Sequence, residues 1–174
     1  LFLQGSLFEK YSQSAEEIMT AVFADNAPRL MQLAKSQILA PGELHDKTED
    51  QGKAILRAFC RRAFRRPATA AEIKGLNQIF LDEFSNSQRL EPAIQKTLTA
   101  VLVMPQFLLK IESAMKNSEP EPINDFDLAS RLSYFLWASM PDEELLQLAE
   151  QGSLSKPEVL QAQISRMLNN RRSK

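Results

Sequence analysis

Hydrophobic and polar residues recur at helical spacing near the C-terminal end of the chain. One stripe of a helix between residues 128 and 139 carries the apolar side chains Leu128, Leu132, Phe135 and Leu136. A second helix is predicted to open at Pro141, with acidic residues at positions 142–144 in its first turn. Negative charge at that end complements the helix macrodipole. The stretch therefore predicts a two-helix corner.

Similar patterns predict helices along most of the chain. Capping residues such as Thr69 mark helix starts, and Pro67 and Gly152 mark helix ends. The first helix is expected to begin at the capping-box pattern of residues 14–17. Predicted helices cover about residues 14–26, 28–40, 48–66, 69–84, 91–103 and 157–168, and a short apolar turn is predicted from Pro105 through Ile111. We predict an all-α fold, a multi-helix array of about eight or nine helices in two packed subunits, with a short strand-like N-terminal remnant.

The segment from Lys116 to Asn124 is polar and contains two prolines, which predicts a linker. We expect four parts along the chain. They are a strand remnant and helical connector at 1–47, a helical domain with the RRAFRRP motif at 48–115, the linker at 116–124, and a helical domain with the LASRLSYFLW motif at 125–174. The last domain is expected to continue beyond residue 174.

Composition narrows the class of protein without naming a function. The chain has 174 residues, 44% of them hydrophobic, and can bury a sizeable core without disulfides. A balance of 21 basic against 22 acidic residues argues against a general polyanion-binding surface, so we predict no nucleic-acid partner. No run of about 18 apolar residues and no basic-then-apolar leader occurs. We therefore predict no membrane span, and we expect any export signal to lie upstream of residue 1.

Residues that usually carry catalysis or bind metals are scarce. Cys60 and His45 are the single cysteine and histidine, so the chain cannot form a disulfide within itself or a Cys-x-x-Cys-His haem attachment. The apolar surroundings of Cys60 in the sequence favour a buried thiol, and His45 is expected in an exposed loop. Acids at 142–144 at a helix start are interpreted as dipole-complementing residues rather than a catalytic pair. We predict no catalytic, cofactor-binding or metal site in this chain.

Five arginines within ten residues form the one local concentration of charge. They are Arg57, Arg61, Arg62, Arg65 and Arg66, with no acid among them. Arginines near a helix C-terminus neutralise its free carbonyls, and this structural role is the favoured interpretation. The alternative is a docking site for an anion or a partner, formed by Arg61, Arg62, Arg65 and Arg66.

The helix that carries Trp137 is apolar on more than one side, which favours a position inside a core. The alternative is a ligand pocket lined by Arg131, Tyr134, Trp137 and Asp142.

The last predicted helix has its own apolar stripe: Val159, Leu160, Ile164, Met167 and Leu168. We expect part of this stripe to be uncovered, and we predict self-association through residues 157–168.

Three ordered motifs carry a resemblance to a known pair of domains. They are RRAFRRPAT at 61–69, VLVMPQFLLKIE at 101–112 and LASRLSYFLWASMPDEEL at 128–145. With them, residues 48–174 resemble two adjoining planctomycete-specific domains of unknown function, found in large extracytoplasmic multidomain proteins that also carry c-type cytochrome-like domains. The resemblance supplies no catalytic residues to transfer.

The resemblance implies a context for the chain. It implies a periplasmic or cell-surface location, other domains of the same polypeptide as partners, and c-type haem elsewhere in the parent protein. It also implies that Leu1–Gly5 is the tail of a preceding β-rich domain, with a cloning remnant as the alternative. We therefore predict a non-catalytic scaffold or interaction module. The alternative is part of an enzyme acting on polysaccharide or a redox substrate, with its catalytic groups mainly in other domains.

Overall fold

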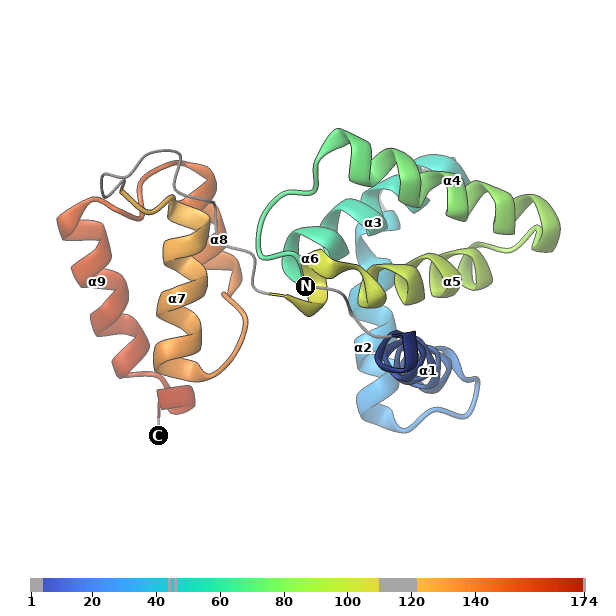
Figure 1. The fold of residues 1–174 in the computed structure, drawn as a ribbon, viewed down its shortest axis with the longest axis horizontal. Helices are drawn as coiled ribbons and strands as arrows, with labels where there is room; N and C mark the ends of the chain where they lie inside the picture. The colour runs from blue at the N-terminus through green and yellow to red at the C-terminus, as the bar shows by residue number, and fades with distance from the viewer. Residues whose placement is uncertain (1–4, 44, 46, 110–121, 174) are drawn as a thin grey trace. The chain divides into compact units, whose positions relative to one another are not determined.

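The computed structural model describes residues 5–43, 45, 47–109 and 122–173 (Figure 1). Of these residues, 78% are helical and none forms a strand, so the all-α prediction is confirmed. The helices are α1 Gly5–Phe23, α2 Arg29–Leu39, η1 Ala40–Gly42, α3 Thr48–Ala63, α4 Ala70–Ser87, α5 Leu90–Val103, α6 Pro105–Leu108, α7 Asp125–Trp137, α8 Glu143–Glu150, α9 Pro157–Leu168 and η2 Arg171–Ser173. The two η elements are short 3₁₀-helices.

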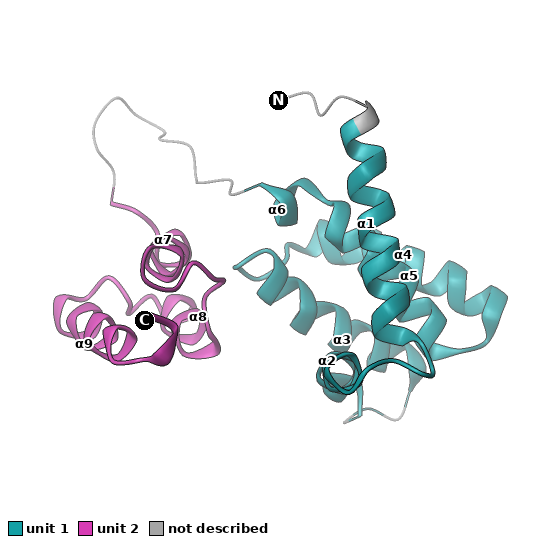
Figure 2. Cartoon of the chain, turned by 90° about the horizontal axis from the view of Figure 1, so that it is seen from below, with its two compact units in different colours: residues 1–110 teal, residues 111–174 magenta. Residues whose placement is uncertain are grey.

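The chain forms two compact units, residues 1–110 and residues 111–174 (Figure 2). Unit 1 contains α1 to α6, so the predicted N-terminal connector shares a unit with the helices that follow it. Unit 2 contains α7, α8, α9 and η2. The predicted linker at 116–124 lies outside the described residues up to position 121.

The first helix begins earlier than the sequence predicted. Residues 1–4 lie outside the described part of the chain, whereas Gly5 is already the first residue of α1. Ser14 therefore lies in the middle of a helix, and its predicted capping role is wrong. No proline or glycine lies between residues 6 and 13 to stop a helix, so α1 continues through Ser14. Ala15, Met19 and Val22 then form its buried face against the rest of unit 1.

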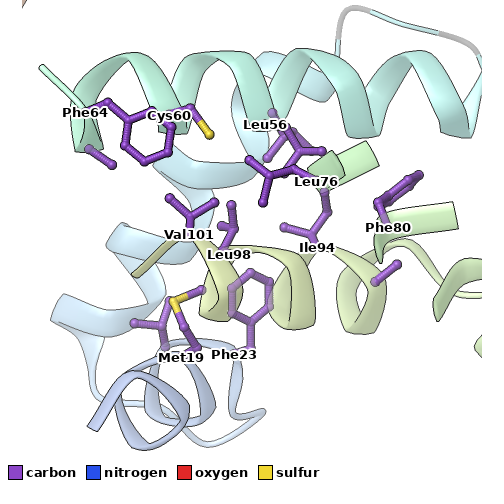
Figure 3. Close-up of a cluster of buried hydrophobic side chains, with 14 residues drawn as sticks. Met19, Phe23, Leu56, Cys60, Phe64, Leu76, Phe80, Ile94, Leu98 and Val101 are labelled. Atoms are coloured by element: carbon purple, nitrogen blue, oxygen red, sulfur yellow. The ribbon is translucent and has the colours of Figure 1, made fainter. Parts of the chain in front are cut away.

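The core of unit 1 is built around α5, which is buried on several sides. In Figure 1, α5 lies between α4 and α1, and in Figure 3 Leu98 and Val101 lie between Cys60 of α3 and Met19 of α1. Leu98, Val101 and Cys60 are fully buried and Met19 is 2% exposed, so the predicted burial of the thiol is confirmed. A helix enclosed in this way must be apolar on several faces. Other core residues are Val22, Phe23, Ile55, Leu56, Leu76, Phe80, Ala93 and Ile94.

Two predicted helix boundaries are confirmed by their hydrogen bonds. Thr69 and Glu72 form a complete capping box at the start of α4. Gly152, after the end of α8, has φ 61° and donates its N–H to the Ala149 carbonyl. Only glycine adopts this left-handed conformation without steric cost, which explains its place at a helix end.

The buried face of α7 differs from the predicted stripe. Phe135 is 86% exposed, whereas the face that enters the core consists of Ala129, Ser130, Ser133 and Trp137. Leu128, Leu132 and Leu136 are half-buried against that core. The small side chains on the buried face leave room for close packing, and a few large residues from α8 and α9 fill the core.

The C-terminal helix is better covered than predicted. Met167 is fully buried, and Val159, Leu160 and Ile164 are half-buried, so unit 2 itself covers most of this stripe. Leu168 is 55% exposed.

A matched pair of glycine substitutions tests the packing of unit 1. A Cβ added at Gly52 of α3 would lie 2.6 Å from ring atoms of Phe80, and Phe80 is fully buried. A Cβ added at Gly75 of α4 would meet nothing within 4 Å. Gly52→Ala should lower the free energy of unfolding by about 1–3 kcal/mol through overpacking. Gly75→Ala should raise it by about 0.5–1 kcal/mol, since alanine favours the helix.

Urea denaturation followed by far-ultraviolet circular dichroism measures both variants. Trp137, the single tryptophan, lies in unit 2, so its fluorescence identifies the transition of that unit separately. Equal stability of the two variants would contradict the close Gly52–Phe80 contact.

Candidate functional site

The arginine-rich segment begins where α3 ends, at Ala63. Phe64 follows as the C-cap, and Arg65 then adopts a left-handed conformation with φ 60°. This conformation is uncommon for a residue with a side chain and is strained unless its surroundings hold it. Here the Arg65 side chain supplies such support, because the residue is only 8% exposed.

The Arg65 guanidinium hydrogen-bonds to the end of another helix. Its Nη2 donates to the Gln106 carbonyl at 2.9 Å and to the Leu109 carbonyl at 3.0 Å. Both carbonyls lie at the C-terminal end of α6, where backbone acceptors lack partners within the helix. Arg65 therefore acts on α6, whereas the favoured sequence interpretation placed its role at the end of its own helix.

Arg66 is also used within unit 1. Its Nη1 lies 3.0 Å from Oε2 of Glu72, and its Nη2 lies 2.8 Å from Oε1, a bidentate pair. Arg66 Nη1 also donates to the Pro67 carbonyl at 2.8 Å, and its guanidinium lies 5.7 Å from the centre of the Phe64 ring. The pair joins the turn after α3 to the first turn of α4.

Glu72 carries two roles at one position. Its carboxylate receives the Arg66 guanidinium, and Oε2 also accepts the backbone N–H of Thr69 at 2.7 Å. The hydrogen bonds from Arg66, together with those from Thr69, lower the pKa of Glu72 from an ordinary 4.5 to about 2 despite its burial. Hydrogen bonding between Arg66 and Glu72 also raises the pKa of Arg66.

The four arginines of the proposed docking site do not form one surface. The Arg65 guanidinium is buried against the end of α6, and Arg66 forms an ion pair with Glu72. Arg62 is exposed, and Arg61 is half-buried with interactions of its own. The segment therefore connects helix ends through two of its members. Binding of an anion by this group stays a prediction.

Removing the Arg65 side chain tests its role at the end of α6. Arg65→Ala leaves the Gln106 and Leu109 carbonyls without this donor, so the free energy of unfolding of unit 1 should fall by about 1–3 kcal/mol. The control is Arg62→Ala, which removes an exposed side chain of the same kind and should change stability by less than about 0.5 kcal/mol. Urea denaturation monitored by circular dichroism measures both. An Arg65→Ala variant as stable as Arg62→Ala would show that the carbonyl bonds contribute nothing.

The Glu72 carboxylate gives unit 1 a specific dependence on pH. The pKa of Glu72 is lower in the folded state than in the unfolded chain. The stabilisation by the Glu72 carboxylate is therefore fully present above pH 4.5 and is lost as the pH falls toward 2. The stability difference between the wild type and Glu72→Gln should therefore shrink over that range. Urea denaturation at a series of pH values measures this difference, with the exposed Glu16→Gln as control. A difference independent of pH would contradict the assigned role.

In unit 2, the candidate pocket residue Trp137 is enclosed by the C-terminal end of the chain. It is 6% exposed, and its Nε1 donates to the Met167 carbonyl and to Ser173 Oγ, each at 3.1 Å. The guanidinium groups of Arg166 and Arg172 lie 5.5 and 5.2 Å from the centre of its ring. A buried indole with a satisfied N–H and cations over its ring is a packing anchor.

Arg166 is the centre of a polar network that sequence reasoning missed. Its Nη1 lies 2.7 Å from Oδ2 of Asp142, the N-cap of α8, and its Nε lies 2.7 Å from Gln163 Oε1. Glu144 joins the network, because its Oε1 accepts from Gln163 Nε2 at 2.7 Å. Burial raises the pKa of Asp142, but hydrogen bonds from Arg166 and from the Leu145 N–H bring it below its ordinary value.

The proposed pocket residues lie in different environments. Trp137 is buried and Asp142 is half-buried, and both contact Arg166. Arg131 is exposed, and Tyr134 is 40% exposed. The structure therefore brings together Trp137 and Asp142 and leaves Arg131 and Tyr134 on the outer part of α7.

The remaining candidates for chemistry are in unit 1. Burial, with a smaller contribution from the charge of Glu72, raises the pKa of the Cys60 thiol to about 12, which keeps it protonated near neutral pH. His45 is exposed, and its backbone carbonyl accepts from Gln51. Within the described residues, no group of three or more His, Cys, Asp or Glu side chains could hold a metal ion. No helix in the same part of the chain has the length and apolar character to cross a membrane.

Two known families match the chain, and each match contains one of the two arginine networks described above. Residues 51–112 match PSD5, described as a protein of unknown function (DUF1595), and residues 123–174 match PSD4, also described as a protein of unknown function (DUF1592). No curated protein and no solved structure matches the chain. The chain thus carries two adjoining domains of unknown function. The Arg65 and Arg66 contacts fall in the first, and the Arg166 network falls in the second.

Proposed function

We propose that this chain, with its two adjoining domains of unknown function, is a non-catalytic helical scaffold or interaction module. Its partners are other domains of the same polypeptide, a large extracytoplasmic bacterial protein associated with c-type cytochrome-like domains. The observation that carries the proposal is the exposed aromatic side chain of Phe135 on α7.

Phe135 is unusual for a large apolar residue. It is 86% exposed, its neighbour Tyr134 is 40% exposed, and Met140, just after the helix, is 37% exposed. Aromatic residues and methionine are enriched where proteins contact one another. A single exposed apolar residue needs no explanation, but three within seven positions at one end of a helix favour a contact surface.

The use of charged side chains supports a structural module. Arg65, Arg66 and Glu72 hold helix ends in unit 1, and Asp142 and Arg166 do the same in unit 2. A catalytic centre usually keeps charged groups available for substrate, with pKa values near the working pH. The shifted carboxylates described above have lowered pKa values that suit ion pairs rather than proton transfer.

The wider context follows from the resemblance of the three sequence motifs. Covalent c-type haem needs a Cys-x-x-Cys-His motif, so in this proposal haem belongs to another domain of the parent protein. Self-association through residues 157–168 would use the edge of α9 with Leu168, because Met167 packs inside unit 2. A complete reading frame with a leader peptide and a haem-attachment motif would support this context, and one without either would contradict it.

Site-specific photo-crosslinking tests the contact surface. A benzoylphenylalanine at position 135, in the polypeptide that contains both domains, should crosslink to a segment of that polypeptide outside residues 123–174. The same probe at exposed Glu158 of α9 is the matched control and should give no such product. Peptide mapping by mass spectrometry identifies the crosslinked segment. Equal products from both positions, or none from position 135, would contradict the proposal.

A stability measurement separates a contact role from a packing role. Phe135→Ala should change the free energy of unfolding of unit 2 by less than about 0.5 kcal/mol, because the side chain is exposed. Trp137 fluorescence during urea denaturation follows this unit.

A further inference from the structure

Helix α1 carries a second apolar stripe that unit 1 does not cover. The buried stripe contains Ala15, Met19, Val22 and Phe23. Ile18 directly precedes the buried Met19 in the sequence, but it is 54% exposed. At 3.6 residues per turn, the outer stripe that contains Ile18 is centred about 100° around the helix axis from the buried stripe. The outer stripe also contains Leu7, 41% exposed, and Tyr11, 39% exposed.

The spacing of this outer stripe is that of a coiled-coil seam. Positions 7, 11, 14, 18 and 21 follow alternate steps of four and three residues, and all of them are exposed. Leu7, Tyr11 and Ile18 are its large members, while Ser14 and Ala21 are small. Such a seam buries its side chains when it pairs with another helix of the same spacing.

Charge complementarity identifies the partner helix and its direction. Lys10 and Glu17 are exposed and lie seven residues apart on the same flank of the seam. When two copies of α1 pair antiparallel, with Leu7 opposite Ile18, Lys10 of each copy faces Glu17 of the other. A parallel pair places apolar residues opposite both charges instead. Gln13 Nε2 donates to Glu17 Oε1 at 2.9 Å, which positions this carboxylate along the helix.

We infer that α1 is a self-pairing surface through which two copies of this chain associate as an antiparallel helix pair. The outer stripe runs from Leu7 to Ala21 of α1, which corresponds to a seam about 21 Å long. One helix pair buries less area than a standard stable interface, so the dimer is weak and its population rises with protein concentration. This surface belongs to unit 1, whereas the proposed contact through Phe135 belongs to unit 2, so either can fail without the other.

Analytical ultracentrifugation of the whole chain over a range of concentrations tests the pairing. The wild type should pass from monomer to dimer, and Ile18→Glu should stay monomeric with an unchanged circular dichroism spectrum. The matched control is Leu30→Glu on α2, which changes a residue that is 72% exposed and outside the seam. It should dimerise like the wild type. A monomeric wild type, or equal dimerisation of Ile18→Glu and the wild type, overturns the inference.

A charge swap tests the antiparallel direction and distinguishes pairing from unspecific apolar contact. Lys10→Glu and Glu17→Lys should each weaken dimerisation by about tenfold, since each places like charges together. The double variant exchanges both charges and should restore the wild-type dissociation constant. Single variants that dimerise normally, or a double variant weaker than both, would overturn the proposed arrangement.

Discussion

The contact between the Arg65 guanidinium and the end of α6 is the polar constraint that holds α6 in unit 1. It joins the turn after α3 to carbonyls 41 and 44 residues further along the chain. A buried guanidinium is tolerated only where its donors find acceptors, and the carbonyls at a helix end provide them. In return, the contact fixes the turn in which Arg65 adopts φ 60°.

In unit 2 a short helix is also held by an arginine, although different residues are involved. Helix α8 has eight residues and α6 has four, so both are too short to be stable by themselves. Arg166 binds Asp142 at the start of α8, and Arg65 binds carbonyls at the end of α6. In each case one arginine neutralises the charge or partial charge at a helix end. Each domain of unknown function thus uses an arginine to attach a short helix to its own core.

This use of charge shapes what the surface can offer. With Arg65, Arg66, Glu72, Asp142 and Arg166 engaged inside their units, large exposed apolar residues become the clearest candidates for contact. They occur on α7 and α9 in unit 2 and on α1 and α2 in unit 1. Helices α1 and α7 are each apolar on more than one face, and each buries only one face in its own unit.

The sequence by itself determined the features that depend on near neighbours. Three such features are the helical class, the Thr69–Glu72 capping box and the left-handed Gly152. Each depends on residues within about five positions of one another, so the sequence pattern predicts it. The burial of Cys60 followed from its apolar neighbours. Ser14 shows the limit of this reasoning, because a capping pattern cannot show whether a helix has already begun upstream of it.

Only the tertiary structure decided which face of α7 is buried and which groups the arginines bind. The stripe that contains Phe135 is the more apolar one, whereas the face that contains Trp137 also carries two serines, and the shape of α8 and α9 decides which is buried. Likewise, Arg166 and Asp142 are 24 residues apart and lie on different helices. Helical periodicity indicates which residues share a face, but it contains no information about distant partners, because those are set by how helices pack.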